Sequence, residues 1–584
     1  MKSRSLLLDL LKGVAIIAVI LYHSGIFQYG YLGVEIFLVI GGYLITKSIL
    51  RSYENEKFSY WTYFCRRLVR LWPLLILISL VSLAIGSFTM LPEHLKNLSE
   101  TVAGTSFFSN NFVQYITSGD YWDQSNDFKP LMHTWYIGLM FQFYVLYPLI
   151  FMLIWKISRY RFRENLTIVL WIIFFLSLAY YLIPTIPDAN KFYLLPARLF
   201  EFALGGLIAV SSHGYLFSAK SKLGRGLLFI FLVSLLVVNV NLQANQVRLL
   251  ASVFLTATLI LLNNKDSFSN ASHQGNFATF LHPLAFLGMA SYSLYLWHQV
   301  VLAFYRYVVN ADFTVSSYVI VLSVSLLMGI LSYYFVEHPI ARKSKKSSLN
   351  LYTIIGISFV LAIILSVFSL KIYKEHGLIR DVPELNLYVG KSVQETQEYN
   401  EAVRQYDHDF DVNGKQNVLV IGDSFARDWL NILVESGVVR NMNLSYHTDA
   451  DSVLEYRIKK ADFIFVANAL SFDAYNELLP KLLKKKFWRV GHKRFGACMG
   501  IFYNAPRDAN YYHQTVRYNR ERDDREQKIF GDRYIDIMAC LRNKEGTYPV
   551  FTPNRKFISH DGIHLTPDGC KYLSQLIDIQ KYLR

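Results

Sequence analysis

Long apolar runs separated by short polar loops occupy the chain up to about residue 372. A helix needs about 20 apolar residues to cross a bilayer, and on that measure the pattern predicts eleven spans. They cover residues 6–23, 32–50, 72–91, 132–155, 167–184, 198–211, 226–241, 248–263, 284–306, 315–336 and 351–371. No small-residue cleavage site follows the first run, so we interpret it as a retained span and not as a signal peptide.

The pattern changes after the last apolar run. Residues 373–415 are polar and irregular, as expected of a linker. Short β-branched runs at 417–421, 463–468 and near 488–490 then alternate with helical segments, which argues for a parallel sheet flanked by helices. We therefore expect a multi-span α-helical membrane domain of about eleven transmembrane helices, followed by an α/β domain. The predicted boundaries are 1–340 for the main membrane domain, 341–372 for an additional transmembrane helix, 373–415 for the linker and 416–584 for the α/β domain.

Composition and charge agree with a membrane protein. Apolar residues make up 53% of the chain and charged residues 18%, against about 25% charged in soluble domains. The net charge of +15 would suit nucleic acid, but the basic residues gather in alternate loops. One set of loops holds 19 Lys and Arg and the other set holds Lys96, Lys129 and Lys191, span edges aside. This bias indicates a cytoplasmic N-terminus, membrane lipids as surroundings and no nucleic-acid partner. An odd number of spans then puts the C-terminal domain outside the cytoplasm.

The four cysteines show no metal-ligand spacing, so we expect no metal. Cys65 falls in a predicted cytoplasmic loop. Cys498, Cys540 and Cys570 share the C-terminal region, where one disulfide could form outside the cytoplasm.

A serine and a histidine motif bracket the α/β region. Gly422-Asp423-Ser424 follows the first predicted strand, and Asp561-Gly-Ile-His564 lies near the end of the chain. Backbone N–H groups at the start of the following helix could stabilise an oxyanion at Ser424. His564 would be the base and Asp561 would orient it. The alternative is a turn Asp-Ser and a loop His with no coupling between them.

Together these motifs resemble the SGNH/GDSL hydrolase family over residues 416–584. The resemblance implies Ser424 as nucleophile, His564 as base and Asp561 as orienting acid. It also implies an oxyanion hole formed by Ser424 and Asn468. The glycine donor usual in that family has no counterpart between Asn441 and Asn468.

Lys12 and His23 lie within the first span. Eleven helical steps separate Lys12 from His23, which leaves the two side chains within about 20° of one face and about 16 Å apart along the axis. Ionisable groups in membrane spans are costly and usually face a cavity or pathway. A snorkelling lysine and an interfacial histidine are the alternatives.

Further motifs follow in order through the membrane region. They are Asp9-Leu-Leu-Lys-Gly13 with His23, Gly33-Val-Glu-Ile-Phe37, Gly41-Gly-Tyr-Leu44, Phe64-Cys-Arg-Arg-Leu-Val-Arg-Leu-Trp-Pro73, His133-Thr-Trp135, Gln142-Phe-Tyr144, Arg198-Leu-Phe-Glu201, Ser291-Tyr-Ser-Leu-Tyr-Leu-Trp-His298 and Phe335-Val-Glu-His-Pro339 with Arg342. This series resembles the acyltransferase-3 family, and the appended SGNH-like domain matches its subgroup that O-acetylates bacterial surface polysaccharides. The family usually has Arg at the position of Lys12, so the charge is kept but the bidentate fork is lost.

The resemblance implies acetyl-CoA as a cytoplasmic donor substrate and no bound cofactor. Arg66, Arg67 and Arg70 could hold its phosphates, although positive-inside topology explains each of them equally well. His23 would act as a general base or carry the acyl group. His133 and Glu201 would line the same cavity.

The expected function is an O-acetyltransferase of the bacterial inner membrane. It would move acetyl from acetyl-CoA to a polysaccharide or lipid-linked glycan, such as lipopolysaccharide O-antigen, through an acyl-enzyme at Ser424 in a periplasmic domain. One alternative is a membrane-anchored polysaccharide esterase or deacetylase. Another is a transporter of a lipid-linked sugar or acyl donor with an accessory esterase.

Overall fold

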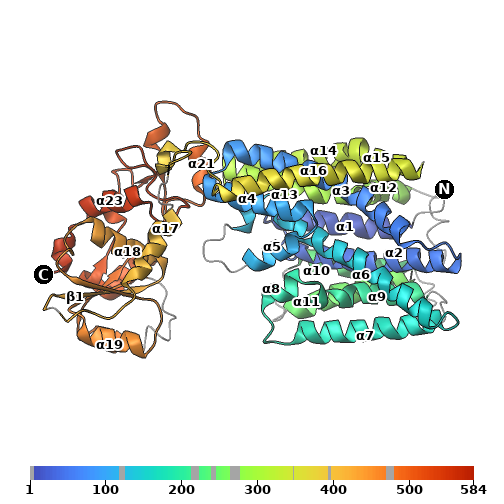
Figure 1. Cartoon of the computed structure of the whole chain (residues 1–584), viewed down its shortest axis with the longest axis horizontal. Helices are drawn as coiled ribbons and strands as arrows, with labels where there is room; N and C mark the ends of the chain where they lie inside the picture. The colour runs from blue at the N-terminus through green and yellow to red at the C-terminus, as the bar shows by residue number, and fades with distance from the viewer. Residues whose placement is uncertain are drawn as a thin grey trace. The chain divides into compact units, whose positions relative to one another are not determined.

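The computed structural model (Figure 1) describes residues 5–117, 125–211, 222–238, 245–262, 276–345, 347–391, 396–412, 414–467 and 479–584. The chain divides into two compact units. The membrane unit comprises Met1–Arg306 and Asp312–Gly377, and the C-terminal unit comprises Tyr307–Ala311 and Leu378–Arg584. This division agrees with the predicted fold class, because helices fill the first unit and a parallel α/β sheet lies in the second.

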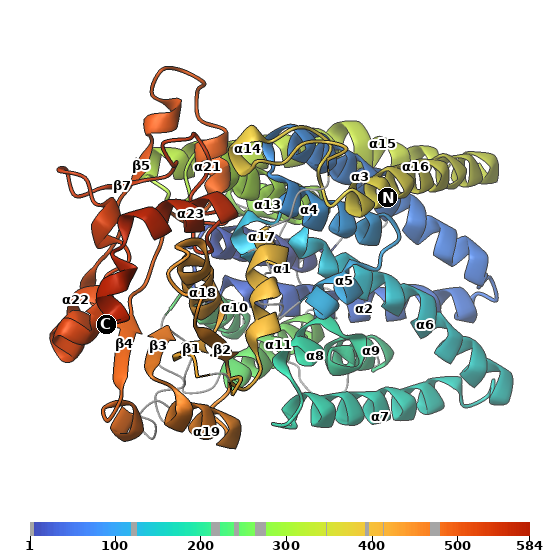
Figure 2. The ribbon, with the colours of Figure 1, turned by 60° about the vertical axis from the view of Figure 1, so that its left-hand side comes forward.

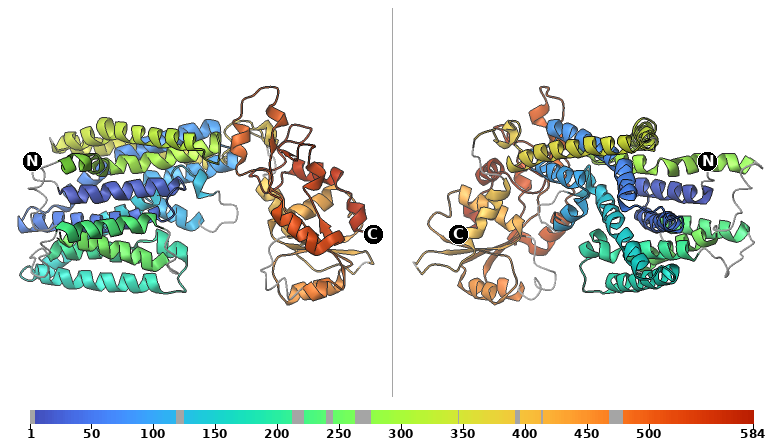
Figure 3. Two further views of the ribbon diagram at one scale, coloured as in Figure 1. Left: turned by 180° about the vertical axis from the view of Figure 1, so that it is seen from behind. Right: turned by 45° about the vertical axis from the view of Figure 1, so that its right-hand side comes forward.

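The membrane unit consists of helices that run alongside one another (Figure 3). Its α-helices are α1 Leu6–His23, α2 Gly33–Glu54, α3 Tyr60–Thr89, α4 Pro92–Ser106, α5 Asn110–Thr117, α6 Trp135–Ile157, α7 Phe162–Leu182, α8 Asp188–Tyr193, α9 Leu199–Val210, α10 Lys222–Val237, α11 Asn245–Leu262, α12 Asn276–Met289, α13 Ser291–Val308, α14 Val315–Ser332, α15 His338–Lys343 and α16 Ser348–Lys374. Within the described residues, eight helical stretches are long and apolar enough to cross a membrane, and α9 and part of α10 are shorter apolar helices.

The helices depart from the predicted spans in three places. Helix α3 begins at Tyr60 and not at residue 72, so Cys65 lies in a helix and not in the predicted loop. The run 284–306, predicted as one span, is divided at Ala290 between α12 and α13. A hydropathy window averages over a break of one residue and therefore misses it. The segment between the third and fourth predicted spans carries α4 and α5, which are too polar to register as spans. The total of eleven spans stays a prediction.

Glycines bring the helices that carry ionisable residues into close contact. A Cβ at Gly288 of α12 would lie 1.8 Å from the backbone oxygen of Asp9, and one at Gly205 of α9 would lie 2.1 Å from that of Val39. Small residues allow such backbone approach between membrane helices. The contacts fix α1 against α12 and α2 against α9.

The C-terminal unit is built on a five-stranded parallel sheet with strand order β2-β1-β3-β4-β6; Figure 2 shows β1 to β4 side by side. Its elements are α17 Thr396–Glu401, β1 Asn417–Gly422, α18 Ser424–Glu435, β2 Asn443–His447, α19 Ser452–Lys460, β3 Phe463–Ala467, β4 Lys486–Val490, α21 Met499–Tyr503, β5 Thr515–Val516, α22 Glu521–Phe530, β6 Tyr534–Ile535, β7 Tyr548–Pro549 and α23 Pro567–Leu576. Strands β5 and β7 form a separate antiparallel pair.

Alternating side chains bury both faces of this sheet. Leu419 and Ile421 of β1 pack in one cluster with Leu454 and Ile458 of α19. Helix α18 lies on the opposite face (Figure 1) and packs Trp429 toward Phe465, with ring centroids 5.5 Å apart. From β1 the chain continues to β2 on one side and then returns to β3 on the other, so β1 lies at a topological switch point. In open α/β sheets, ligands bind beyond the carboxyl ends of the strands at such a point.

Several local expectations can be compared with this unit. Strands β1, β3 and β4 coincide with the three predicted runs, whereas β2 and β6 were not predicted. The four cysteines, all within the described residues, are unpaired thiols. The segment expected as a linker includes α17, whose Asn400 hydrogen-bonds to α18.

Candidate active sites

Ser424 lies where β1 ends and α18 begins, at the switch point of the sheet. Gly422 closes β1 with φ +135°, and a Cβ there would lie 1.9 Å from the Ala467 backbone oxygen, so only glycine fits this turn. Asp423 caps the helix by accepting a hydrogen bond of 2.9 Å from the Phe425 N–H. Ser424 is thereby the first residue of the helix, with its side chain buried.

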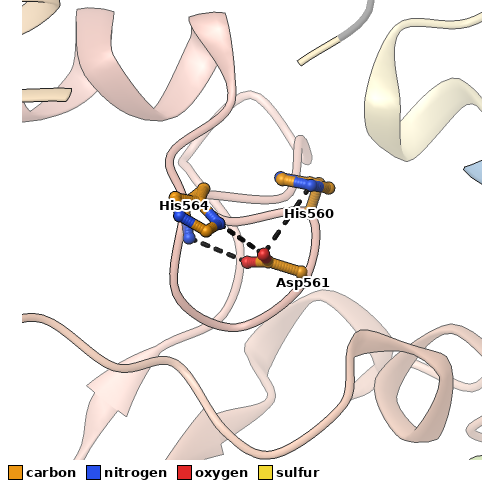
Figure 4. A group of neighbouring side chains, drawn as sticks. All are labelled: His560, Asp561 and His564. Carbon is orange, nitrogen blue, oxygen red and sulfur yellow. Dashed lines mark hydrogen bonds and ion pairs between the residues drawn. The ribbon is translucent and has the colours of Figure 1, made fainter. Parts of the chain in front are cut away.

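Ser424, His564 and Asp561 form a hydrogen-bonded series. Ser424 Oγ lies 2.8 Å from His564 Nε2, and His564 Nδ1 lies 2.5 Å from Asp561 Oδ2. Figure 4 shows the Asp561 carboxylate facing the His564 ring. Because Nδ1 faces a carboxylate it carries the proton, which leaves Nε2 free to accept the proton of Ser424. The arrangement can therefore activate the serine as a nucleophile.

The backbone holds the Asp561 carboxylate in place. Its Oδ1 accepts hydrogen bonds from the N–H groups of Ile563 at 2.7 Å and His564 at 2.8 Å. Burial raises the pKa of Asp561, but the neighbouring His560 and the hydrogen bond from His564 outweigh it, so the net pKa lies well below the usual range. The group is a carboxylate at neutral pH and can orient the imidazole.

The same loop offers ligand atoms that a metal ion could use. His560, Asp561 and His564 (Figure 4) present three such atoms within 4.8 Å of one another. Both nitrogens of His564, however, already face Ser424 and Asp561. His564 is therefore fully engaged in the serine series, and the absence of a metal requirement stays a prediction.

A buried carboxylate behind the serine ties three segments together. Asp428 of α18 accepts hydrogen bonds from Asn400 Nδ2 at 2.6 Å and from the Leu565 N–H at 3.0 Å, and its Oδ2 lies 2.9 Å from Lys493 Nζ. Asn400 Nδ2 also lies 3.2 Å from the backbone oxygen of Ser424. Asp428 thus joins the serine helix to the histidine loop.

The expected oxyanion-hole residue Asn468 lies outside the described residues. The N–H groups of Phe425, Ala426 and Arg427 in the first turn of α18 donate to Asp423. The donor expected at this helix start is therefore the N–H of Ser424 itself, which stays a prediction.

In the membrane unit, α1 contributes to two cavities. Lys12 lines a cavity of about 140 Å³ and His23 lines one of about 1010 Å³. Tyr295 of α13 lines both. Lys12 and His23 of α1 therefore line different cavities, which share the side chain of Tyr295.

The smaller cavity is basic. Lys12, Arg67 and Arg70 line it, and no carboxylate does. Lys12 Nζ lies 3.4 Å from Asp9 Oδ1. Arg66 is exposed and is not among the residues that line this cavity.

A group of three histidines lies at the end of α1. The His298 ring centroid is 5.3 Å from that of His23 and 5.1 Å from that of His133. Arg306 Nη2 donates to the His23 backbone oxygen at 2.6 Å, and Tyr295 Oη donates to the His133 backbone oxygen at 2.5 Å. His133, predicted to line a cavity, lies behind the ring of Tyr295 and does not line either one.

Glu201 belongs to a buried ionic group. Arg198 Nη1 donates to both oxygens of Glu35 at 3.0 Å and to Glu201 Oε1 at 3.1 Å. All three side chains are almost fully buried. Glu35 and Arg198 line the larger cavity, and Glu201 lies behind Arg198.

Sequence reasoning passed over several of these residues. Glu35, Arg198 and His298 are ionisable groups within apolar runs, and the argument that selected Lys12 and His23 would have selected them too. Nothing in the local sequence singles out Asp428, whose partners come from distant segments.

Comparison with protein families identifies the family of the membrane unit. The model of an acyltransferase domain, that of the acyltransferase-3 family, matches residues 6–336. The chain belongs to the acyltransferase-3 family. With its apolar helices, this membership makes it a multi-pass membrane protein.

Curated relatives carry a related name. O-acetyltransferase OatA of Staphylococcus aureus strain NCTC 8325 / PS 47 is 28% identical over 369 residues, which is 58% of this chain and 58% of that protein. OatA of strain COL gives the same values. The chain thus matches little more than half the length of these relatives. No solved structure matches it.

Proposed function

We propose that the protein transfers acetyl groups from cytoplasmic acetyl-CoA to hydroxyl groups of a bacterial surface polysaccharide. Two features of this member of the acyltransferase-3 family support the proposal most directly. One is the hydrogen-bonded series Ser424–His564–Asp561, and the other is the two cavities lined by α1, which share Tyr295. The name of OatA supports acetyl as the transferred group.

The smaller cavity is the proposed donor site. Lys12, Arg67 and Arg70 supply three positive charges, and the lining adds no carboxylate. Cationic side chains of this kind bind phosphate groups such as those of coenzyme A. Arg66 makes no contribution to this lining, so we limit the donor proposal to the other three.

His23 is the proposed centre of the first half-reaction. The thioester C–S bond breaks, and the acetyl carbonyl passes to His23 itself or to an oxygen nucleophile from which His23 takes the proton. The thiolate keeps the electron pair of the broken bond and takes up the proton that the nucleophile has released. His133 and Glu201 would support this centre through His298 and Arg198, which contact them.

Ser424 is the proposed last carrier. Its Oγ attacks the carbonyl of the acetyl group carried by the membrane unit while His564 Nε2 takes the hydroxyl proton. The bond between the acetyl group and its carrier breaks, the carrier leaves with the proton from His564, and an acetyl ester of Ser424 remains. A sugar hydroxyl then attacks this ester, His564 accepts the sugar proton, and that proton returns to Ser424 Oγ as the acyl bond breaks. The backbone N–H of Ser424 would stabilise each oxyanion, with Asn468 as a further donor.

The decisive experiment follows acetyl from radiolabelled acetyl-CoA into polysaccharide in membrane vesicles. Ser424→Ala should abolish transfer to polysaccharide, and Ser436→Ala, a serine at the far end of α18, should not. Normal labelling in Ser424→Ala would remove the serine from the mechanism.

The two half-reactions should separate. His23→Ala and Lys12→Ala should stop labelling from acetyl-CoA, while Ser424 still reacts with an activated acetyl ester added outside. Lys12→Arg should keep much of the activity because it retains the charge. Full activity in His23→Ala would contradict the proposed role of α1.

The proposed orientation has the N-terminus in the cytoplasm and the C-terminal unit in the periplasm, as the charge bias of the loops indicates. A periplasm-dependent reporter fused after Arg584 should be active. Activity of a cytoplasmic reporter at that position would show that the number of spans is even.

A membrane-anchored esterase or deacetylase is the second candidate, favoured by the serine series alone. Vesicles would then release acetate from acetylated polysaccharide without acetyl-CoA and would incorporate no label. A transporter with an accessory esterase would instead carry its substrate across in Ser424→Ala vesicles without acetylation.

A further inference from the structure

The larger cavity of the membrane unit has far more room than an acetyl group needs. It measures about 1010 Å³, compared with about 140 Å³ for the smaller cavity. Pockets for drug-sized molecules measure about 300–1,000 Å³, whereas an acetyl group has three heavy atoms. The cavity is therefore suited to a large ligand and not to the transferred group alone.

Flat aromatic rings form part of its wall. Tyr22 and Phe192 are each 38% exposed and line the cavity together with Tyr31 and Trp135. Their positions are held by ring contacts, since Tyr22 lies 5.5 Å from Tyr31 and Phe192 lies 4.4 Å from Trp135, centroid to centroid. Rigid amphipathic rings of this kind can stack on the C–H face of a sugar ring.

Buried charged groups form another part of the wall. Glu35 and Arg198 line the cavity and are each 2% exposed. Behind them Glu201 is 0% exposed, and its Oε2 has no hydrogen-bond partner among the described residues. Carboxylate oxygens accept hydrogen bonds and guanidinium groups donate them, so a ligand hydroxyl, which does both, matches this group.

The charges argue against two other kinds of ligand. A lipid tail would have to lie against Glu35, Arg198, Asp127, Asp188 and Lys191, which apolar chains do not solvate. A polyphosphate would meet three carboxylates and only two of these cations. The smaller cavity, with three cations and no carboxylate, suits phosphates better.

We propose that the larger cavity of the membrane unit binds a saccharide segment of the acceptor glycan. Tyr22 and Phe192 stack on its rings, and Glu35 and Arg198 form hydrogen bonds with its hydroxyls. The identity of the ligand as the acceptor rests on the proposed function. The membrane unit is then a glycan-binding module as well as the donor site, and His23 lies in the wall of the glycan cavity.

The test is equilibrium binding to the full-length protein in lipid nanodiscs, read by saturation-transfer NMR. The probes are oligosaccharides from the cells' own surface polysaccharide, freed of O-acetyl groups by mild alkali, and the same oligosaccharides on polyprenyl diphosphate. Binding of both indicates that free glycan can enter, and binding of the second alone identifies a lipid-linked source. Absence of binding by both would overturn the proposal.

Matched variants locate the binding. Tyr22→Ala combined with Phe192→Ala should weaken binding about tenfold or more, while Tyr22→Phe keeps the ring and should retain it. Phe88→Ala, which removes a ring that is 81% exposed on α3 and lines neither cavity, should have no effect. Equal binding by all variants would mean that the glycan does not occupy this cavity.

Glu35→Gln tests the polar wall and should also weaken binding, with unchanged acetyl-CoA binding as the control for folding. Ser424→Ala should bind the probes as the unmodified protein does. Saccharide binding without acetyl transfer would contradict the proposed function and support the glycan-binding cavity. Acetyl transfer without saccharide binding in the membrane unit would support the proposed function and contradict the glycan-binding cavity.

Discussion

Replacing Asp561 by Asn should disable Ser424 while leaving the fold in place. In the native protein Oδ1 accepts from two backbone N–H groups and Oδ2 accepts from His564 Nδ1. Asn has one oxygen, and the two backbone donors at 2.7 and 2.8 Å hold it. The amide NH₂ must then face Nδ1, which becomes an acceptor, and the proton moves to Nε2. A protonated Nε2 cannot take the proton of Ser424.

The expected loss follows from this change of tautomer. The same substitution in a serine protease lowers kcat about 10⁴-fold, which corresponds to about 5.5 kcal/mol of transition-state stabilisation. We expect a loss of that order in the Ser424-dependent release of 4-nitrophenol from 4-nitrophenyl acetate by the full-length protein.

The control is Asp568→Asn, the same chemical change in the first turn of α23. It should lower the rate of 4-nitrophenol release by less than about twofold, because surface substitutions have small effects. A loss below about tenfold in Asp561→Asn would refute the reasoning, because His564 would then be oriented without the carboxylate.

Three further predictions concern the surroundings of the serine. Lys493→Met leaves the buried Asp428 carboxylate without its cation and should lower stability by about 3–5 kcal/mol in thermal unfolding. Adding Asp428→Asn should recover part of that loss, and no recovery would argue against the pair. Gly422→Ala introduces a Cβ 1.9 Å from a backbone oxygen at a φ that disfavours side chains, so fluorophosphonate labelling of the serine should fall sharply; normal labelling would show that the turn can adapt. Because the folded-state pKa of Asp561 is lowered, its stabilisation is present above the unfolded pKa of about 3.9 and is lost as pH falls through the folded pKa. Asp561→Ala should therefore destabilise the protein more at pH 7 than at pH 2, and an equal effect at both values would contradict an ionised carboxylate.

Local patterns were enough to predict the architecture. Apolar runs of span length predicted most of the membrane helices, and the strand before Ser424 predicted β1 and the parallel sheet. The motifs also predicted that Ser424, Asp561 and His564 would lie together, since one follows the central strand and the others share a loop. Their catalytic roles stay predictions.

Features that depend on distant partners could not be predicted in this way. Strand β2 is Asn443–His447, a polar run that is recognised as a strand only because it pairs with β1. Arg198 and Glu35 form their ion pair across 163 positions, and Lys493 pairs with Asp428 across 65. Such pairs depend on how whole helices and strands pack, so the local sequence of one segment does not predict them.

Tyr295 has a consequence for the permeability of the membrane. Its phenol lines both cavities and is bonded to the backbone oxygen of His133, so the partition between two open spaces is about one side chain thick. A thin partition shortens the distance over which a two-carbon group must be handed on. In the proposed orientation, with the smaller cavity facing the cytoplasm and the larger one facing the periplasm, most of the transmembrane voltage would fall across this side chain. The ring of Tyr295 would then also be the barrier to protons and sodium ions, and a small residue in its place should make the membrane leaky to them.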